Sequence, residues 1–268
     1  MARRHIDDST PTNSLVMPDY TGGVRGYIPR DIPYGDPQNE AMGGVPMGDY
    51  PDDLIDPSDF KEVIQDCHDR QLFPMYHEED HGMAVRWNQN GLPYCWAWSA
   101  TIALMNIRQA AGKAAVALAP TSLGWLVNWS SSGYYLNRTI AGAKERGIAS
   151  TAFVPDIHSR NPRTFVPGWE DDALKYRTGE WWDGQPGSDL HVIRQCLTIL
   201  RTGSPIYLAY NWWGHALCGI GMLFDETKYL NVVFIIRNSH GEIEPIELSG
   251  NRMVPDEHYG LRMGSLAG

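Results

Sequence analysis

The chain has 268 residues, of which 43% are apolar, and a net charge of −10. This length suits one large domain or one domain with an arm, and the apolar fraction is sufficient for a substantial core. The sequence has neither a run of about eighteen apolar residues nor a stripe of basic ones, so a membrane span and nucleic-acid binding are not expected. The basic start at residues 1–5 is followed by Asp7 and Asp8 instead of an apolar stretch. We therefore expect no secretory signal and a cytoplasmic or other reducing compartment, with a place in a virion as an alternative.

The acidic residues are concentrated in the first third of the chain. Residues 1–83 hold 17 of the 32 acidic residues and 6 of the 22 basic ones. Residues 1–55 are rich in Pro, Gly and Asp without sustained periodicity, which is typical of irregular chain. We predict an acidic, irregular N-terminal arm over residues 1–71, the leading segment, and a main domain over residues 72–268. The arm is interpreted either as a solvated extension or as a segment that docks on another surface, as a pro-segment or an assembly arm.

Apolar periodicity predicts several helices followed by several strands. The longest helix, at residues 94–111, carries Trp96, Ala100 and Ala103 on one face and is rich in small residues, as expected for a helix at the centre of a domain. Further helices are predicted at residues 61–72, from residue 120, at 136–146 and at 189–203. Strands are predicted at residues 205–210, 215–224, 231–237 and 259–263. This order predicts an α+β domain with a helical lobe and a sheet-rich lobe.

The four cysteines are Cys67, Cys95, Cys196 and Cys218, and they form no C-x-x-C pair of the kind that binds metals. Disulfide frameworks occur mainly in small secreted domains, so none is predicted here. Cys196 lies in an apolar helical pattern and Cys218 in an apolar strand-like run, which favours buried thiols at both positions. We expect neither a metal nor an organic cofactor.

Cys95 differs from the other cysteines because it stands at the start of the long apolar helix. A helix N-terminus offers free N–H groups and partial positive charge to the sulfur. Both favour the thiolate, which is the nucleophilic form of cysteine. Cys95 is therefore a candidate nucleophile, with inert packing as the alternative, and the residues around it decide between the two.

These surroundings resemble the papain-like cysteine peptidases, the family of papain and the cathepsins. In that family a Gln lies six residues before the nucleophilic Cys, and Trp-Ala-Phe-Ser or a similar run begins directly after it. Gln89 has this spacing from Cys95, and residues 96–99 read Trp-Ala-Trp-Ser. The resemblance implies that Cys95 is the nucleophile and that the Gln89 amide belongs to an oxyanion hole. It also implies a two-lobed fold with a long central helix and an antiparallel sheet or barrel.

The resemblance continues downstream in the same order. His215 opens a segment similar to the family's His-Ala-Val strand, and Asn238 lies in Arg-Asn-Ser-His-Gly, which is similar to Lys-Asn-Ser-Trp-Gly. These matches imply that His215 is the base and that Asn238 orients it. Gly133 and Tyr134 match a glycine-rich region whose backbone binds an extended peptide in relatives. Trp213, just before His215, is expected either to pack inside the domain or to line the cleft.

The sequence also departs from the family. Leu92 stands where many relatives have a disulfide-bonded cysteine, which agrees with a reducing compartment. His240 replaces a Trp that in relatives shields the hydrogen bond between the Asn and the His. Residues 1–71 lack the helical pattern of the inhibitory pro-segments in many members, and the resemblance covers about residues 72–268.

The expected activity is that of a cysteine endopeptidase, which hydrolyses peptide bonds of a protein or peptide with a Cys-His-Asn triad. One alternative is a structural or assembly protein on the same fold, for example in a viral particle, whose arm over residues 1–71 binds neighbours in a larger complex. Another is acyl transfer of the transglutaminase or amidase type, because the first half of the reaction is shared. Neither nucleic acid nor membrane is an expected partner.

Overall fold

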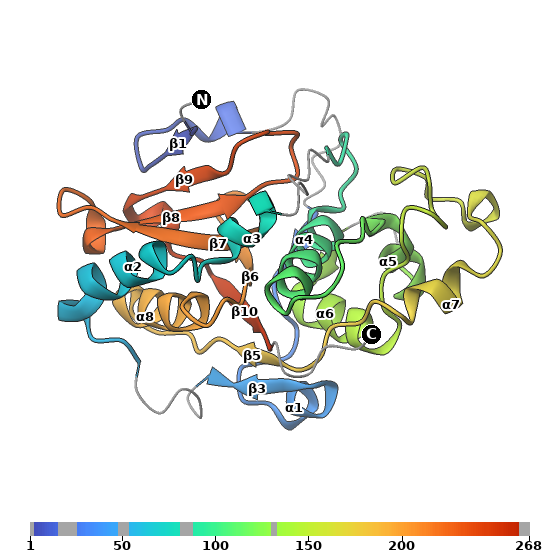
Figure 1. The fold of residues 1–268 in the computed structure, drawn as a ribbon, viewed down its shortest axis with the longest axis horizontal. Helices are drawn as coiled ribbons and strands as arrows, with labels where there is room; N and C mark the ends of the chain where they lie inside the picture. Colours follow the sequence, from blue (N-terminus) through green and yellow to red (C-terminus); the bar gives the residue numbers. More distant parts are fainter. Residues whose placement is uncertain (1–2, 16–25, 48–53, 81–87, 130–132, 263–268) are drawn as a thin grey trace.

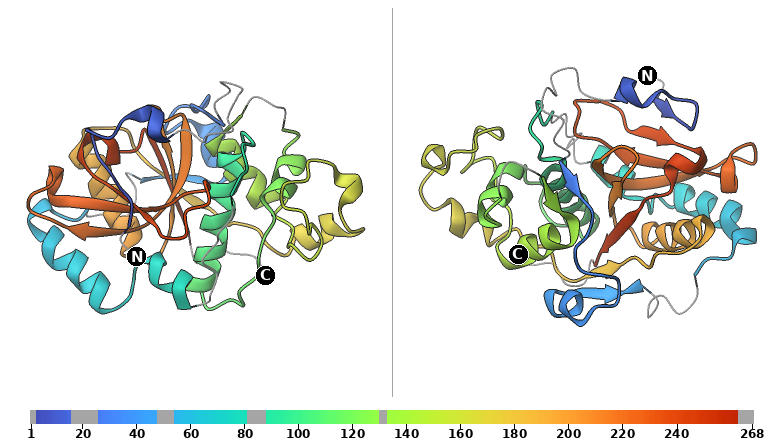
Figure 2. Two further views of the ribbon diagram at one scale, coloured as in Figure 1. Left: turned by 90° about the horizontal axis from the view of Figure 1, so that it is seen from above. Right: turned by 180° about the vertical axis from the view of Figure 1, so that it is seen from behind.

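The computed structural model describes residues 3–15, 26–47, 54–80, 88–129 and 133–262, and it shows a sheet-rich lobe beside a helical lobe (Figures 1 and 2). Helix α4 (Cys95–Ala110) lies between the lobes. It contacts the sheet on one side and helices α5 (Pro120–Leu126) and α6 (Leu136–Glu145) on the other. This mixed arrangement confirms the α+β fold that the sequence predicts.

The remaining elements surround α4. The other α-helices are α1 (Pro37–Met42), α2 (Phe60–Asp69), α3 (Pro74–Asp80), α7 (Trp169–Ala173) and α8 (Asp189–Leu200). Short 3-10 helices occupy Thr12–Leu15, Pro57–Asp59, Pro162–Thr164, Tyr229–Asn231 and Gly250–Met253. The strands are β1 (His5–Ile6), β2 (Tyr27–Ile28), β3 (Gly44–Pro46), β4 (Tyr134–Tyr135), β5 (Trp181–Asp183), β6 (Ile206–Tyr210), β7 (His215–Phe224), β8 (Val232–Arg237), β9 (Ile246–Leu248) and β10 (Glu257–Leu261). Among the described helices, none is long and apolar enough to cross a membrane.

The main sheet has the strand order β1-β9-β8-β7-β6-β10-β5-β3. Neighbours from β9 to β5 run antiparallel, whereas β1 joins β9 and β3 joins β5 in parallel. Both edge strands therefore come from the first 46 residues of the chain. A separate pair is formed by β2 and β4, which also run parallel.

The central helix forms because its sequence suits complete burial. Of its 16 residues, all but Ala110 are buried, and small side chains such as Ala97 and Ala103 let neighbouring elements approach closely. Helix α8 begins where the sequence predicts, because the Ser188 hydroxyl caps it by accepting a hydrogen bond from the His191 backbone N–H. Helices α2 and α8 both pack on the sheet (Figure 1). The predicted helices and strands agree with the observed ones to within a few residues.

The described part of the leading segment is ordered against the rest of the chain. The Arg30 guanidinium donates to both oxygens of Asp183, at 2.9 and 3.0 Å, and the Asn39 amide donates to the same carboxylate at 2.6 Å. Glu257 accepts hydrogen bonds from the Tyr27 hydroxyl at 2.6 Å and the Arg30 backbone N–H at 2.7 Å. Composition indicated irregular chain here, and the structure adds short strands to it. The proposed boundary at residue 71 stays a prediction.

A buried ion pair fixes the strand that ends next to Asn238. The Arg237 guanidinium bonds both oxygens of Glu78 on α3, and the exposed fractions of the two side chains are 3% and 1%. We expect Glu78→Ala to lower the free energy of unfolding by about 3–5 kcal/mol, because a buried cation loses its partner. Thermal or urea unfolding measures the loss. The matched control is Glu226→Ala, whose exposed pair with Lys61 contributes at most about 1 kcal/mol; equal losses in both variants would contradict the prediction.

Candidate active site

Cys95 is the first residue of α4 and is 1% exposed. Burial raises the pKa of its thiol to about 12, although the backbone N–H groups of Ala216 and Trp96 interact with the sulfur and oppose the shift. Ala216 directly follows His215 on β7. The folded chain therefore brings the sulfur at the helix tip to the first residues of a strand 120 positions away in the sequence.

His215 is buried at the start of β7 and bonds Asn238, which directly follows the neighbouring strand β8. Its Nε2 atom lies 2.7 Å from Asn238 Oδ1. That oxygen also accepts the Ser239 backbone N–H at 2.8 Å, and the Asn238 amide nitrogen donates to Glu242 at 3.1 Å, so the amide orientation is fixed by three contacts. An acceptor oxygen requires that Nε2 carries the proton, which leaves Nδ1 as the basic nitrogen of the neutral ring.

Burial also governs the charge of the His215 ring. It lowers the pKa of His215 to about 4, and the hydrogen bond that His215 donates to Asn238 opposes this shift only in part. The ring packs against the rings of Trp213, at a centroid distance of 5.0 Å, and His240, at 4.4 Å, which also contact each other at 6.1 Å. Burial lowers the pKa of His240 to about 2, so this second ring is neutral as well. His240 therefore packs against the His215 ring as an uncharged aromatic ring.

Gln89 lies beside the same group of residues. Its side-chain oxygen accepts the Ser239 hydroxyl at 2.5 Å, and its amide nitrogen donates to the Leu92 carbonyl at 2.6 Å. The backbone N–H of Gln89 donates to the Ser239 carbonyl at 2.8 Å. A primary amide has two hydrogens, and among the described residues only the Leu92 carbonyl accepts one of them, which leaves the second N–H of Gln89 for a ligand. Ser239 thus connects Gln89 to Asn238 through hydrogen bonds on both sides.

The structure brings most of the residues expected from the sequence into one region. His215 bonds Asn238, and Trp213 contacts His215. The Ala216 backbone N–H next to His215 favours the Cys95 thiolate, but among the described residues no hydrogen bond joins Cys95 Sγ to the His215 ring. Tyr134 lies on β4, and the Gly133 carbonyl just before it accepts the Trp129 indole N–H at 3.2 Å. The catalytic and substrate-binding roles of these residues stay predictions.

Two residues of the region had no role in the sequence prediction. Ser239 and Glu242 both bond the Asn238 side chain, and Glu242 also receives a bond from Arg4 at 3.4 Å. The sequence feature that could have identified them is their position, one and four residues after Asn238 in a segment of turns. Within the described ranges, no three His, Cys, Asp or Glu side chains gather as metal ligands do.

The chain's own leading segment covers the Cys95 sulfur. A Cβ atom placed on Gly26 would lie 2.7 Å from Cys95 Sγ, which is closer than any real contact of this kind. The next two residues form β2 and pair with Tyr134 and Tyr135 of β4, and the Gly26 carbonyl accepts the Tyr134 N–H at 3.2 Å. The strand expected to bind a peptide is therefore already paired with residues 26–28.

In this closed state the thiol is expected to react slowly at neutral pH. A folded-state pKa of about 12 means that the Cys95 thiolate forms only as the pH rises well above the ordinary thiol value near 9. We expect the rate of iodoacetamide alkylation at Cys95, followed by peptide mass spectrometry, to increase continuously from pH 7 to pH 10. A rate that levels off below pH 8 would contradict this expectation, because it would report a thiolate already formed in the closed chain.

No protein-family model and no curated protein matches the chain. Among solved structures, it is similar to a digestive procathepsin L from the larval midgut of Tenebrio molitor, with a TM-score of 0.53 and 13% identity over 68% of this chain and 66% of that one. A recombinant stem bromelain precursor gives a TM-score of 0.53 with 17% identity over 70% of each chain. Xylellain, a cysteine protease from Xylella fastidiosa, gives 0.51 with 18% identity over 66% of this chain and 81% of that one. The match spans just under two thirds of the procathepsin. At these identities the comparisons establish the architecture, and the chain has the papain-like α+β fold.

Proposed function

We propose that the chain is a cysteine peptidase, with Cys95 as nucleophile and His215 as base. The observation that best supports this proposal is the 2.7 Å bond from His215 Nε2 to Asn238 Oδ1, because it leaves Nδ1 free to take a proton. The Cys95 sulfur lies at the amide of Ala216, immediately after that histidine. The papain-like fold of the chain is consistent with this chemistry.

In the proposed reaction, His215 Nδ1 takes the proton of the Cys95 thiol as the sulfur attacks the carbonyl carbon of a peptide bond. The negative charge that develops on the carbonyl oxygen is stabilised by the Cys95 backbone N–H and the free amide hydrogen of Gln89. The C–N bond breaks when the imidazolium gives its proton to the leaving amine. A water molecule, deprotonated by Nδ1, then attacks the thioester, releases the acid and restores the thiol.

The leading segment acts as a pro-segment in this proposal. Gly26 lies against the Cys95 sulfur and β2 occupies the edge of β4, so a substrate peptide reaches neither while the segment is in place. Once it leaves, the backbone of Gly133 and Tyr134 is free to bind an extended peptide by strand addition. Trp213, which contacts His215, forms part of the wall on the other side of the cleft.

The proposal is tested with the full chain carrying Gly26→Val, whose larger side chain collides with Cys95 Sγ and the backbone of Pro93 and displaces the segment. We expect this variant to release peptides from a fluorescently labelled, unfolded protein, and the double variant with Cys95→Ser to release none. If the Gly26→Val chain neither cleaves the protein nor reacts with a thiol-directed epoxide, although trypsin cuts its displaced segment, the proposal fails.

A structural or assembly role is the second candidate function, and the contacts of the leading segment are the evidence on it. Strands β1 and β3 complete both edges of the sheet within one chain, and Arg30 is paired inside that chain, so the described arm residues are already occupied. Light scattering on the full chain separates the two roles. A monomer supports the peptidase, and a defined oligomer that dissociates in Arg30→Ala supports assembly.

Acyl transfer shares the first half-reaction, and addition of hydroxylamine to the assay distinguishes it. A transferase forms the hydroxamate in preference to the acid, whereas the proposed hydrolase releases mainly acid. We also propose a reducing compartment as the site of action. The four cysteines are buried and free, and Cys95 must stay reduced to react.

A further inference from the structure

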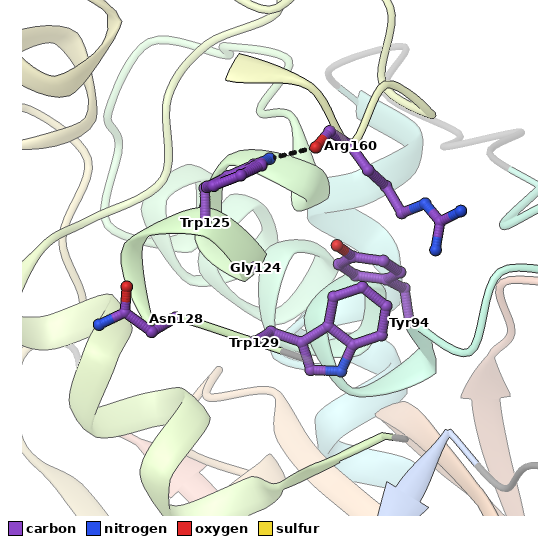
Figure 3. A pocket seen from close by; sticks show the side chains of 6 residues that line it. All are labelled: Tyr94, Gly124, Trp125, Asn128, Trp129 and Arg160. Carbon is purple, nitrogen blue, oxygen red and sulfur yellow. Dashed lines mark hydrogen bonds between the residues drawn. The ribbon is translucent and has the colours of Figure 1, made fainter. Parts of the chain in front are cut away.

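A pocket of about 350 Å³ opens on the helical lobe beside the start of α4 (Figure 3). It is lined by Tyr94, Gly124, Trp125, Asn128, Trp129 and Arg160. None of these residues belongs to the proposed catalytic group. The pocket is therefore a feature that the peptidase proposal does not use.

The walls of the pocket are aromatic and are held in place by their neighbours. The rings of Tyr94 and Trp129 lie 4.0 Å apart between centroids. The indole N–H of Trp125 donates to the Arg160 carbonyl at 2.7 Å, and that of Trp129 donates to the Gly133 carbonyl at 3.2 Å. The N–H groups of both indoles are therefore satisfied, and the rings offer apolar surface to the pocket. Trp125 is 42% exposed, so part of its ring is accessible from solvent.

Gly124 on α5 is what makes room for this arrangement. A Cβ atom at that position would lie 2.4 Å from Tyr94 Cε1 and 2.9 Å from the Tyr94 hydroxyl oxygen. Only glycine therefore allows the Tyr94 ring to lie this close to α5. The space is part of the packing of the lobe and not a gap between mobile surface side chains.

One hydrogen-bond donor, the Tyr94 hydroxyl, faces the pocket without a partner among the described residues, and Arg160 lies at the rim of the pocket. Tyr94 is 1% exposed, and its hydroxyl faces the space between the Trp125 indole and the Arg160 side chain (Figure 3). Burial raises the pKa of Tyr94, and the nearby Arg160 charge opposes the shift, so the hydroxyl is a donor at neutral pH. The guanidinium of Arg160 makes no ion pair within the part of the chain that the structure describes. The Tyr94 hydroxyl opens onto the pocket, so a ligand atom placed there can accept its hydrogen bond.

We propose that this pocket binds an aromatic group that carries a carboxylate. The ring packs on the accessible faces of Trp125 and Trp129, and the carboxylate accepts the Tyr94 hydroxyl and pairs with Arg160. Two sources offer this chemistry: a free aryl carboxylate, or the C-terminal residue of a peptide that ends in Trp, Tyr or Phe. The site is separate from the proposed catalytic group, so its occupation does not depend on peptidase activity.

The test measures binding to the full chain by ligand-observed NMR and calorimetry. The probes are 2-naphthoate and N-acetyltryptophan, each compared with its neutral amide. We expect both acids to bind at least about tenfold more tightly than the amides, because the amides lose both the ion pair with Arg160 and the charge-assisted hydrogen bond from the Tyr94 hydroxyl. A short peptide ending in a free Trp that binds tenfold more tightly than N-acetyltryptophan identifies the peptide source, and equal affinities identify the free aryl carboxylate.

Three variants locate the binding site. Tyr94→Phe removes one hydroxyl, and we expect it to weaken acid binding about tenfold, whereas Arg160→Gln is expected to weaken it about twofold to fivefold. Arg163→Gln, an exposed arginine on the same loop outside the pocket, is the matched control and should leave binding unchanged. Absence of acid binding at millimolar concentration, equal binding of acids and amides, or unchanged binding in Tyr94→Phe would each overturn the proposal.

Discussion

Replacing Cys95 with Ala is expected to lower hydrolysis of an unfolded protein by about 10⁴-fold or more once the leading segment has been displaced. The sulfur forms the covalent bond to the substrate in the proposed reaction, and no other group in the described site takes that role. Removal of the nucleophile from a catalytic triad leaves only the contribution of substrate binding and the oxyanion hole. The rate of peptide release from the Gly26→Val chain, with and without Cys95→Ala, measures the loss.

The matched control for this prediction is Cys196→Ala. Cys196 is also a free and fully buried thiol, but it lies on α8. Its substitution should keep the rate within a factor of about two, as expected for a core change away from the reacting atoms. A loss of similar size in both variants would mean that Cys95 acts through stability and not through its chemistry.

Loosening the leading segment is expected to increase the reactivity of Cys95 about 100-fold. Arg30 bonds both oxygens of Asp183, whose exposed fraction is 1%, so Arg30→Ala leaves a buried carboxylate without its cation in the closed state. That loss is on the order of 3 kcal/mol, and each 1.4 kcal/mol changes an equilibrium about tenfold. In the open state water solvates Asp183, so the equilibrium shifts toward opening. The measurement is the rate of epoxide labelling of Cys95 at pH 7.

A second ion pair of the same segment gives the control. Asp31 and Arg138 are bonded at 2.6 Å, but their side chains are 31% and 37% exposed. Exposed pairs contribute at most about 1 kcal/mol, so Arg138→Ala should increase labelling no more than about fivefold. If the epoxide labels Cys95 no faster in the Arg30→Ala chain than in the Arg138→Ala chain, the buried contacts do not hold the leading segment closed.

The main elements of the fold could be predicted from the sequence because their periodicity is long enough to detect. Helix α4 and strand β7 each extend over ten or more residues, and their predicted bounds agree with the observed ones to within a residue. Strands β1, β2 and β3 have two or three residues, which is too short for an alternating pattern. Their position depends on the partner strand, and Pro- and Gly-rich composition gives no indication of it.

The candidate site was predictable to the extent that it depends on residue type and order. His215 and Asn238 were identified together, and their side chains are hydrogen-bonded in the structure. Glu242 was missed because an exposed-looking Glu after a strand has no distinctive spacing. The contact of Gly26 with the Cys95 sulfur was also missed, since a glycine in an irregular segment carries no information about what it packs against.

In the proposed mechanism, His215 makes the Cys95 sulfur nucleophilic after the leading segment moves away. The most direct measurement is the rate at which a thiol-directed epoxide labels Cys95 in the Arg30→Ala chain at pH 6 to 7, compared with the same chain carrying His215→Ala, with the labelled residue identified by mass spectrometry. We expect the rate of labelling at Cys95 to fall about 100-fold or more without the imidazole. Equal rates with and without His215, or labelling confined to other cysteines, would contradict this mechanism.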